Sequence, residues 1–243
     1  MASLNILKGR INVVTNTKKI THAMELVASS KLRKARELYE NIKSYQDNLE
    51  KTFNDLLLHV NPNEFNTLFP KHPGIEANMY ILITSDLGLC GSYNSNLITY
   101  LKQKIQPKDM VVVVGSKGYA ALSNSIYKDQ IIKVYHDYGD TVSYNLGNEI
   151  SKLAIDTYYD KKINGVNIIY TKFISNVQQD AVEFKLFPFQ LPSGDYIKSS
   201  VVEFEPDANT ILKNSVPLYV GSMIYCLGTS AKISEMASRR TAM

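Results

Sequence analysis

The chain has 243 residues, 44% of them hydrophobic, and a formal net charge of +4. This length and apolar content allow a sizeable buried core and exclude a disordered polypeptide. Its two cysteines, Cys90 and Cys226, lie far apart without CxxC spacing, so the sequence predicts neither a disulfide framework nor a zinc site and favours a reducing compartment. The N-terminus lacks the apolar run of a secretory signal, and the longest nearly apolar run, 216–228, is shorter than the roughly 20 residues of a spanning helix. We therefore expect a soluble protein.

The positive charge is concentrated at the N-terminal end. Residues 1–40 carry eight Lys or Arg against three Glu, so this segment has a charge of +5 and the remainder of the chain −1. Such asymmetry predicts an acidic partner for the N-terminal segment. That partner could be a protein, a nucleic acid or an anionic membrane face.

The first 60 residues predict one very long helix. Apolar or small residues recur at steps of three and four from position 4 to about position 58, with no proline and no glycine after Gly9. At about 1.5 Å per residue, a helix of about 50 residues is roughly 75 Å long, which is too long for an ordinary globular domain. It therefore needs a helical partner, and small residues such as Thr21, Ala28 and Ala35 allow that partner to approach closely.

The C-terminal segment, 206–243, predicts the partner helix. Acidic residues flank a proline at 205–207, which is typical of a helix start. The helical pattern reaches Met243 without a stop signal, so we expect this helix to be incomplete. Together with segment 1–60 it is predicted to form a long antiparallel coiled coil. The face expected to meet the first helix carries Leu212, Tyr219, Met223, Leu227, Ser230, Ser234, Ala237 and Thr241.

Between these helices the sequence predicts an α/β domain over residues 76–200, preceded by a linker at 62–75. Apolar runs rich in β-branched residues alternate with helical patterns, which is typical of a mostly parallel, Rossmann-like sheet with right-handed crossovers. The expected strands are 79–84, 110–115, 131–135 and 166–173, with an edge strand at 181–187 and a loop at 188–199, and the expected helices are 94–105, 117–125 and 141–159.

The loops of this domain predict no catalytic, metal or cofactor site. The loop at 84–92 has GxxG spacing rather than the GxGxxG of dinucleotide-binding folds, so we expect a sharp contact loop there. Cys90 has no histidine in a recognisable pairing pattern, and the adjacent His136 and Asp137 point in opposite directions. A nucleotide-binding enzyme and a basic coiled-coil nucleic-acid adaptor are the alternatives from other classes of protein.

Three separated stretches are distinctive. They read NTKKITHAMELVASSKLR at 16–33, ITSDLGLCGSYN at 83–94 and SEMASRRTAM at 234–243. These stretches, with their order and spacing, resemble the gamma subunit of F-type ATP synthases, the central rotor shaft. The resemblance covers essentially the whole chain. It implies an antiparallel coiled coil of the two termini inserted into a hexamer of alpha and beta subunits, with the α/β domain at the base.

The resemblance also implies a function. Such a chain would be a non-catalytic subunit without a cofactor or small-molecule substrate, which couples rotation to ATP synthesis or hydrolysis and to proton flow. An epsilon subunit and a membrane c-ring would be further partners, nucleic acid would not be one, and the complex would lie on the cytoplasmic side of a bacterial membrane. A gamma-like shaft of a specialised F1-like ATPase without proton coupling is the alternative within this class.

Residue by residue, the resemblance implies contacts with beta. Met24 matches the family's shaft methionine facing beta, and Arg239 matches the C-terminal arginine that lies near it. Four basic residues, and three residues of the loop after the first strand, would meet the acidic lever loops of beta. Leu87 stands where the family usually has a basic residue and Ser92 where it has a glycine, and gamma chains normally continue beyond the position of Met243. The basic residues are Lys31, Arg33, Lys34 and Arg36, and the loop residues are Asp86, Leu87 and Cys90.

Overall fold

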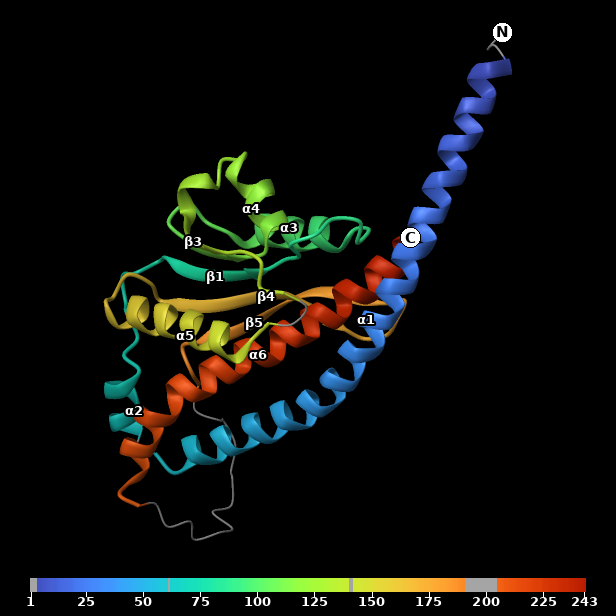
Figure 1. Cartoon of the computed structure of the whole chain (residues 1–243). Coiled ribbons are helices and arrows are strands. Elements are labelled where there is room, and N and C mark those ends of the chain that lie inside the picture. Colours follow the sequence, from blue (N-terminus) through green and yellow to red (C-terminus); the bar gives the residue numbers. More distant parts are fainter. Residues whose placement is uncertain (1–3, 61, 140–141, 191–204) are drawn as a thin grey trace.

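The computed structural model describes residues 4–60, 62–139, 142–190 and 205–243. Its most prominent feature is a pair of long helices that cross one flank of an α/β domain (Figure 1). Helix α1 spans Leu4–Leu58 and helix α6 spans Ala208–Ala242. The predicted pair of long terminal helices is confirmed.

The two long helices run antiparallel, because contacts that advance along α1 recede along α6. Leu32 shares an apolar cluster with Ile233, whereas the ring of Phe53 stacks on that of Tyr219 with centroids 3.9 Å apart. Residues 4–20 of α1 are all exposed and project beyond the end of α6 (Figure 1). The coiled coil therefore covers only the second half of α1.

One five-stranded sheet forms the centre of the α/β domain, in the order β3-β2-β1-β4-β5. The first four of these strands pair in parallel and β5 runs antiparallel to β4. This confirms the predicted mostly parallel sheet with an added edge strand. The strands are β1 (Asn78–Ile83), β2 (Met110–Val114), β3 (Ile131–Tyr135), β4 (Gly165–Phe173) and β5 (Gln179–Phe187).

Helices cover both faces of this sheet, and β1 shows the division. Met79, Ile81 and Ile83 belong to the core that contains residues of α5 and α6, whereas Tyr80 and Leu82 belong to the core that contains residues of α3. Successive side chains of a strand point to opposite faces, so one buried strand supplies both cores. The shorter helices are α3 (Tyr93–Lys104), α4 (Ser116–Ser123) and α5 (Tyr144–Tyr159), with a 3₁₀ turn at Lys128–Gln130.

The segment predicted as a linker is partly helical. Helix α2 spans Pro62–Leu68, and Phe65 and Phe69 are buried with ring centroids 5.2 Å apart. Phe69 also packs edge-on against Phe189 at 5.1 Å. The apolar area of these aromatic rings anchors the segment to the core, although its prolines suggested an extended connection. Most of the predicted loop at 188–199 lies outside the described residues.

The face predicted for α6 was wrong at two positions. The hydroxyls of Ser230 and Ser234 face β4 rather than α1, because Phe173 N donates to Ser230 Oγ at 3.3 Å and Ser234 Oγ donates to Thr171 O at 3.0 Å. Ile233 occupies the contact with α1 instead. Since α6 packs on α1, α5 and β4 together, it is buried on several sides and a single apolar stripe does not define its orientation.

Candidate functional site

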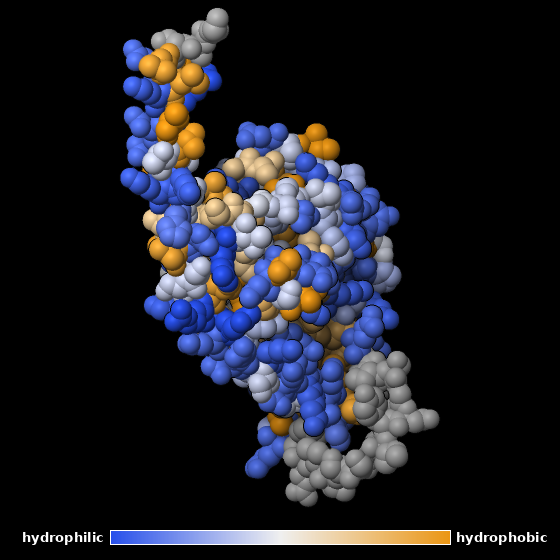
Figure 2. Space-filling view, turned by 90° about the vertical axis from the view of Figure 1, so that its right-hand side faces the viewer, coloured by the Kyte–Doolittle hydropathy of each residue, from blue (hydrophilic) through white to orange (hydrophobic). Residues whose placement is uncertain are grey.

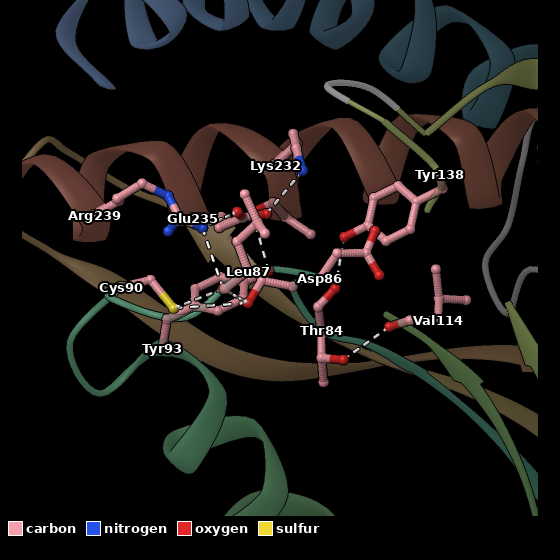
Figure 3. A network of polar contacts seen from close by, with 12 residues as sticks. Thr84, Asp86, Leu87, Cys90, Tyr93, Val114, Tyr138, Lys232, Glu235 and Arg239 are labelled. Atoms are coloured by element: carbon pink, nitrogen blue, oxygen red, sulfur yellow. Dashed lines mark hydrogen bonds and ion pairs between the residues drawn. The ribbon is translucent and has the colours of Figure 1, made fainter. Parts of the chain in front are cut away.

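The loop after β1, residues 84–91, lies against α6 (Figure 3), and Asp86 attaches it to the start of α4. The Asp86 Oδ1 atom accepts hydrogen bonds from Ser116 N and Ser116 Oγ, both at 2.9 Å. Because Ser116 begins α4, the carboxylate lies at the positive end of that helix. Asp86, predicted to touch a partner, is thus used to attach the loop to the neighbouring turn.

The middle of the loop is fixed by buried polar contacts. Asn94 of α3 donates from Nδ2 to Ser85 Oγ at 2.8 Å and to Cys90 Sγ at 3.2 Å, and Ser85 Oγ donates to Leu87 O at 2.7 Å. Cys90 is only 2% exposed, so its thiol packs inside the loop. By contrast Leu87 and Leu89 are 68% and 64% exposed. The loop is therefore a fixed support that presents two apolar side chains.

Arg239 connects this loop to α6. Its guanidinium donates to Gly88 O, to Leu87 O at 3.3 Å and to Glu235 Oε1 at 2.5 Å. Glu235 also pairs with Lys232, whose Nζ lies 3.0 Å from Oε2. Glu235 is 2% exposed and Arg239 8%, so a buried network of charges holds the loop in place (Figure 3). Paired, hydrogen-bonded charges of this kind are costly to break.

Tyr138 closes the network from the opposite side. Its hydroxyl donates to Thr84 O at 2.6 Å, and Lys232 Nζ lies 4.9 Å from the centre of its ring. Burial, followed by the charges of Glu235 and Asp86, holds the pKa of Tyr138 well above its usual value. The phenol therefore stays a neutral hydrogen-bond donor.

A cavity of about 590 Å³ lies between α1, α6 and this loop. Its wall contains five of the nine predicted contact residues, so the structure brings these five together. Apolar side chains of α1, among them Ile20 and Val27, form another part of the wall and are themselves largely exposed. The five predicted residues in the wall are Met24, Lys31, Asp86, Leu87 and Arg239.

The remaining predicted residues lie apart from the cavity. Arg33 and Lys34 are exposed on α1, and Cys90 is buried under the loop. Arg36 is exposed, but its Nη2 atom donates to Asn176 Oδ1 at 2.9 Å, in the turn between β4 and β5. Of the four predicted basic residues, Lys31 thus lines the cavity, Arg33 and Lys34 are exposed, and Arg36 contacts the α/β domain.

Sequence reasoning missed three members of the network. Lys232 and Glu235 carry a usable signal, because residues 232, 235 and 239 are spaced at three and four positions and so share one face of a helix. Tyr138 has no such signal, since its place depends on how the loop after β3 folds back over β1. A local pattern cannot report that contact.

The polar residues at the ends of β1, β2 and β3 do not form a nucleophilic triad. Ser116 Oγ lies 3.3 Å from His136 Nδ1, but its hydroxyl also donates to Asp86. In a triad the carboxylate orients the histidine, whereas here it binds the serine. Over the described ranges the structure contains no group of three His, Cys, Asp or Glu side chains arranged to hold a metal ion.

The described helices also include none that is long and apolar enough to cross a membrane. Fold and site together define a class of protein: an α/β domain that carries a long two-helix shaft, with a fixed loop and a basic segment at the side of the shaft. Five of the nine predicted contact residues line one surface cavity beside the shaft.

Comparisons with known proteins narrow this class. The family model described as ATP synthase matches residues 3–243. An ATP synthase gamma chain of Mycoplasmopsis synoviae (strain 53) is 44% identical over 248 residues, which is 100% of this chain and 86% of the relative. The ATP synthase gamma chain of Clostridium novyi (strain NT) is 34% identical over 100% of this chain and 85% of the relative. The chain therefore belongs to the ATP synthase gamma chain family.

Solved structures agree on the fold. The central stalk and c-ring structure of the mitochondrial ATP synthase of Tetrahymena thermophila contains a chain with a TM-score of 0.69 and 23% identity, over 92% of this chain and 97% of that one. A rotor chain of the Euglena gracilis enzyme gives a TM-score of 0.53 at 13% identity, over 91% of this chain and 90% of that one. The long helices and the sheet domain are thus arranged as in a central stalk.

Proposed function

We propose that this chain is the central rotor shaft of an ATP synthase, coupling rotation to ATP synthesis or hydrolysis on a hexamer of alpha and beta subunits and to proton flow. The chain carries no catalytic residue and binds no nucleotide. The α/β domain is the base, where an epsilon subunit and a membrane c-ring attach, and the complex lies peripherally on the cytoplasmic side of the bacterial membrane.

The observation that carries this proposal is the projecting part of α1. Leu4, Leu7, Ile11 and Val14 follow one another at steps of three and four, and all are exposed. Figure 2 shows hydrophobic residues along one side of this projection and hydrophilic residues along the other. An apolar stripe of this kind needs cover from a further helix or from another protein surface. A shaft inserted into a ring of subunits has that cover on every side.

The contact with beta is proposed to combine charge and apolar surface. Lys31 lines the cavity and Arg33 and Lys34 are exposed in the next turn of α1, so an acidic loop of beta is attracted without a single fitted geometry. Met24 and Leu87 add apolar contact at the cavity wall. Nondirectional attraction of this kind persists while the shaft turns.

Charge reversal tests this contact. We expect Lys31, Arg33 and Lys34 changed together to Glu to lower ATP hydrolysis by the reconstituted complex at least about five-fold, equivalent to ~1 kcal/mol in the barrier. The matched control changes Lys43, Lys51 and Lys152 to Glu. These residues are also exposed but lie away from the cavity. Equal turnover in the two triple variants would refute the proposed contact.

Proton pumping in vesicles separates the proposed synthase from the alternative motor. The alternative stays under test because Leu87, which is 68% exposed, stands where the family usually has a basic residue. ATP-driven acidification of vesicles that contain the complex supports a coupled synthase. Hydrolysis and rotation without acidification assign the chain to an F1-like ATPase that lacks proton coupling.

A further inference from the structure

The hairpin formed by β4 and β5 extends past the sheet toward both long helices. Its end, residues 171–179, is called the hairpin tip below. Figure 1 shows this end of β4 and β5 beside the place where α6 lies against α1. The hairpin tip is thus positioned to connect the α/β domain with the shaft.

On the side of α6, three serines hold the hairpin. Ser230, Ser234 and Ser238 recur every four residues and therefore share one helix face. Ser230 accepts from Phe173 N at 3.3 Å, and Ser234 donates to Thr171 O at 3.0 Å. Ser238 Oγ donates to Gln179 Oε1 at 2.9 Å. The three bonds attach both strands of the hairpin to α6.

On the side of α1, a polar and an aromatic contact meet the same hairpin. Arg36 Nη2 donates to Asn176 Oδ1 at 2.9 Å, and the ring of Tyr39 lies edge-on to Phe173 with centroids 5.6 Å apart. Phe173 and Tyr39 also pack against the cluster that joins Leu32 to α6. The hairpin tip therefore contacts α1 and α6 at the same level of the shaft.

The turn itself is ordered by its own hydrogen bonds. Gln178 O accepts from Ile174 N at 3.3 Å and from Ser175 N at 2.9 Å, and Gln178 N donates to Ser175 Oγ at 3.0 Å. Asn176 lies within this closed turn. It is thus held in place as an acceptor for Arg36, since the backbone around it is already fixed.

We infer that the hairpin tip is a strut that fixes the rotational setting of α1 against the α/β domain, with Arg36 and Asn176 as its positioning residues. Apolar packing between two helices is nondirectional and permits small rotations. A hydrogen bond depends on distance and angle, so the bond from Arg36 resists such rotation. A strut of this kind would help the shaft to transmit torque, and that role rests on the proposed function. The contact between Arg36 and Asn176 does not, because it lies within this chain.

Hydrogen exchange on the isolated full chain tests the contact. We expect Arg36→Met to speed exchange of the Ile174 and Ser175 amides about five-fold, which corresponds to ~1 kcal/mol of lost stabilisation. Asn176→Ala should act alike, and Asn176→Asp should slow exchange because it adds charge to the acceptor. The control is Lys43→Met, an exposed residue seven positions further along α1. Unchanged exchange in both Arg36→Met and Asn176→Ala would overturn the strut.

Single-molecule rotation tests the role in torque. With the alpha and beta subunits fixed to a surface and a probe on Ile126→Cys, which is exposed on the α/β domain, the spread of pause angles reports torsional stiffness. We expect Asn176→Ala, which leaves every predicted contact with beta in place, to widen this spread about 1.5-fold at unchanged ATP hydrolysis. A spread equal to that of Lys43→Met would refute the role in torque. If the unmodified chain neither assembles nor rotates, the proposed function fails and hydrogen exchange alone decides the strut.

Discussion

Helix α1 has one sequence pattern and two environments. From Ala28 to Leu57 it contains all of its buried residues and packs along α6, whereas from 4 to 20 every residue is exposed. The same three-and-four spacing of apolar residues runs through both halves. The pattern therefore reports that a helix needs cover but not which surface supplies it. The packed half takes its cover from α6, and for the projecting half we propose cover from outside the described residues, by the alpha and beta subunits or by further turns of a C-terminal helix.

The largest effect should come from breaking the network of charges formed by Lys232, Glu235 and Arg239 of α6. Glu235→Ala leaves Lys232 and Arg239 buried without their shared anion, and we expect a loss of about 3–5 kcal/mol in the free energy of unfolding. Urea unfolding of the isolated chain measures this loss. Glu235→Gln retains an acceptor oxygen and should lose less.

Glu183→Ala is the matched control for that change. Glu183 pairs with Lys104 at 3.2 Å, but the lysine side chain is 46% exposed and the glutamate 22%. A surface pair of this kind contributes about 0–1 kcal/mol. Equal destabilisation by Glu235→Ala and Glu183→Ala would show that the network around Arg239 does not hold the loop to α6.

A second comparison sets the two halves of α1 directly against each other. Leu32→Ala removes a buried side chain between α1 and α6, and we expect it to cost about 2–5 kcal/mol. Leu7→Ala changes a residue that is 46% exposed, and its effect on the isolated chain should stay within about 0.5 kcal/mol. Thermal unfolding of both variants measures the difference. A large loss for Leu7→Ala would mean that the projecting half has cover within this chain.

The architecture was predictable because its elements are long or strongly patterned. Fifty-five residues of α1 and the β-branched run of β2 carry periodicity that few alternatives match. Helix α2 was missed because prolines at 62 and 70 suggested a linker, although the buried rings of Phe65 and Phe69 override that local signal. Ser230 and Ser234 were misplaced because a helix buried on several sides has no single apolar stripe.

The site was predictable only where a resemblance supplied it. Met24, Lys31 and Arg239 do surround one cavity, but their partners inside the chain depend on contacts between distant segments. Arg239 donates to the carbonyl of Gly88, which is 151 positions away in the sequence. No spacing rule predicts a contact between segments so far apart. For Arg36, the contact with Asn176 appears only once the β4–β5 turn is placed beside α1.

The smallest effect is expected at the N-terminal end of α6. Asp207 caps this helix: its Oδ1 accepts from Thr210 N at 2.9 Å and its Oδ2 from Thr210 Oγ1 at 2.7 Å. The backbone bond from Thr210, followed by the hydroxyl bond, lowers the pKa of Asp207 below its ordinary value of 3.8. A lowered pKa in the folded state contributes stability above the ordinary value, and this contribution is lost as the pH falls through the lowered one. Asn also caps a helix but does not titrate, so Asp207→Asn should keep the cap and reduce the acid sensitivity of the melting temperature below about pH 4. Asp207→Ala should lower the melting temperature at every pH, and an identical acid profile for Asp207→Asn and the unmodified chain would show that this cap does not couple α6 to pH.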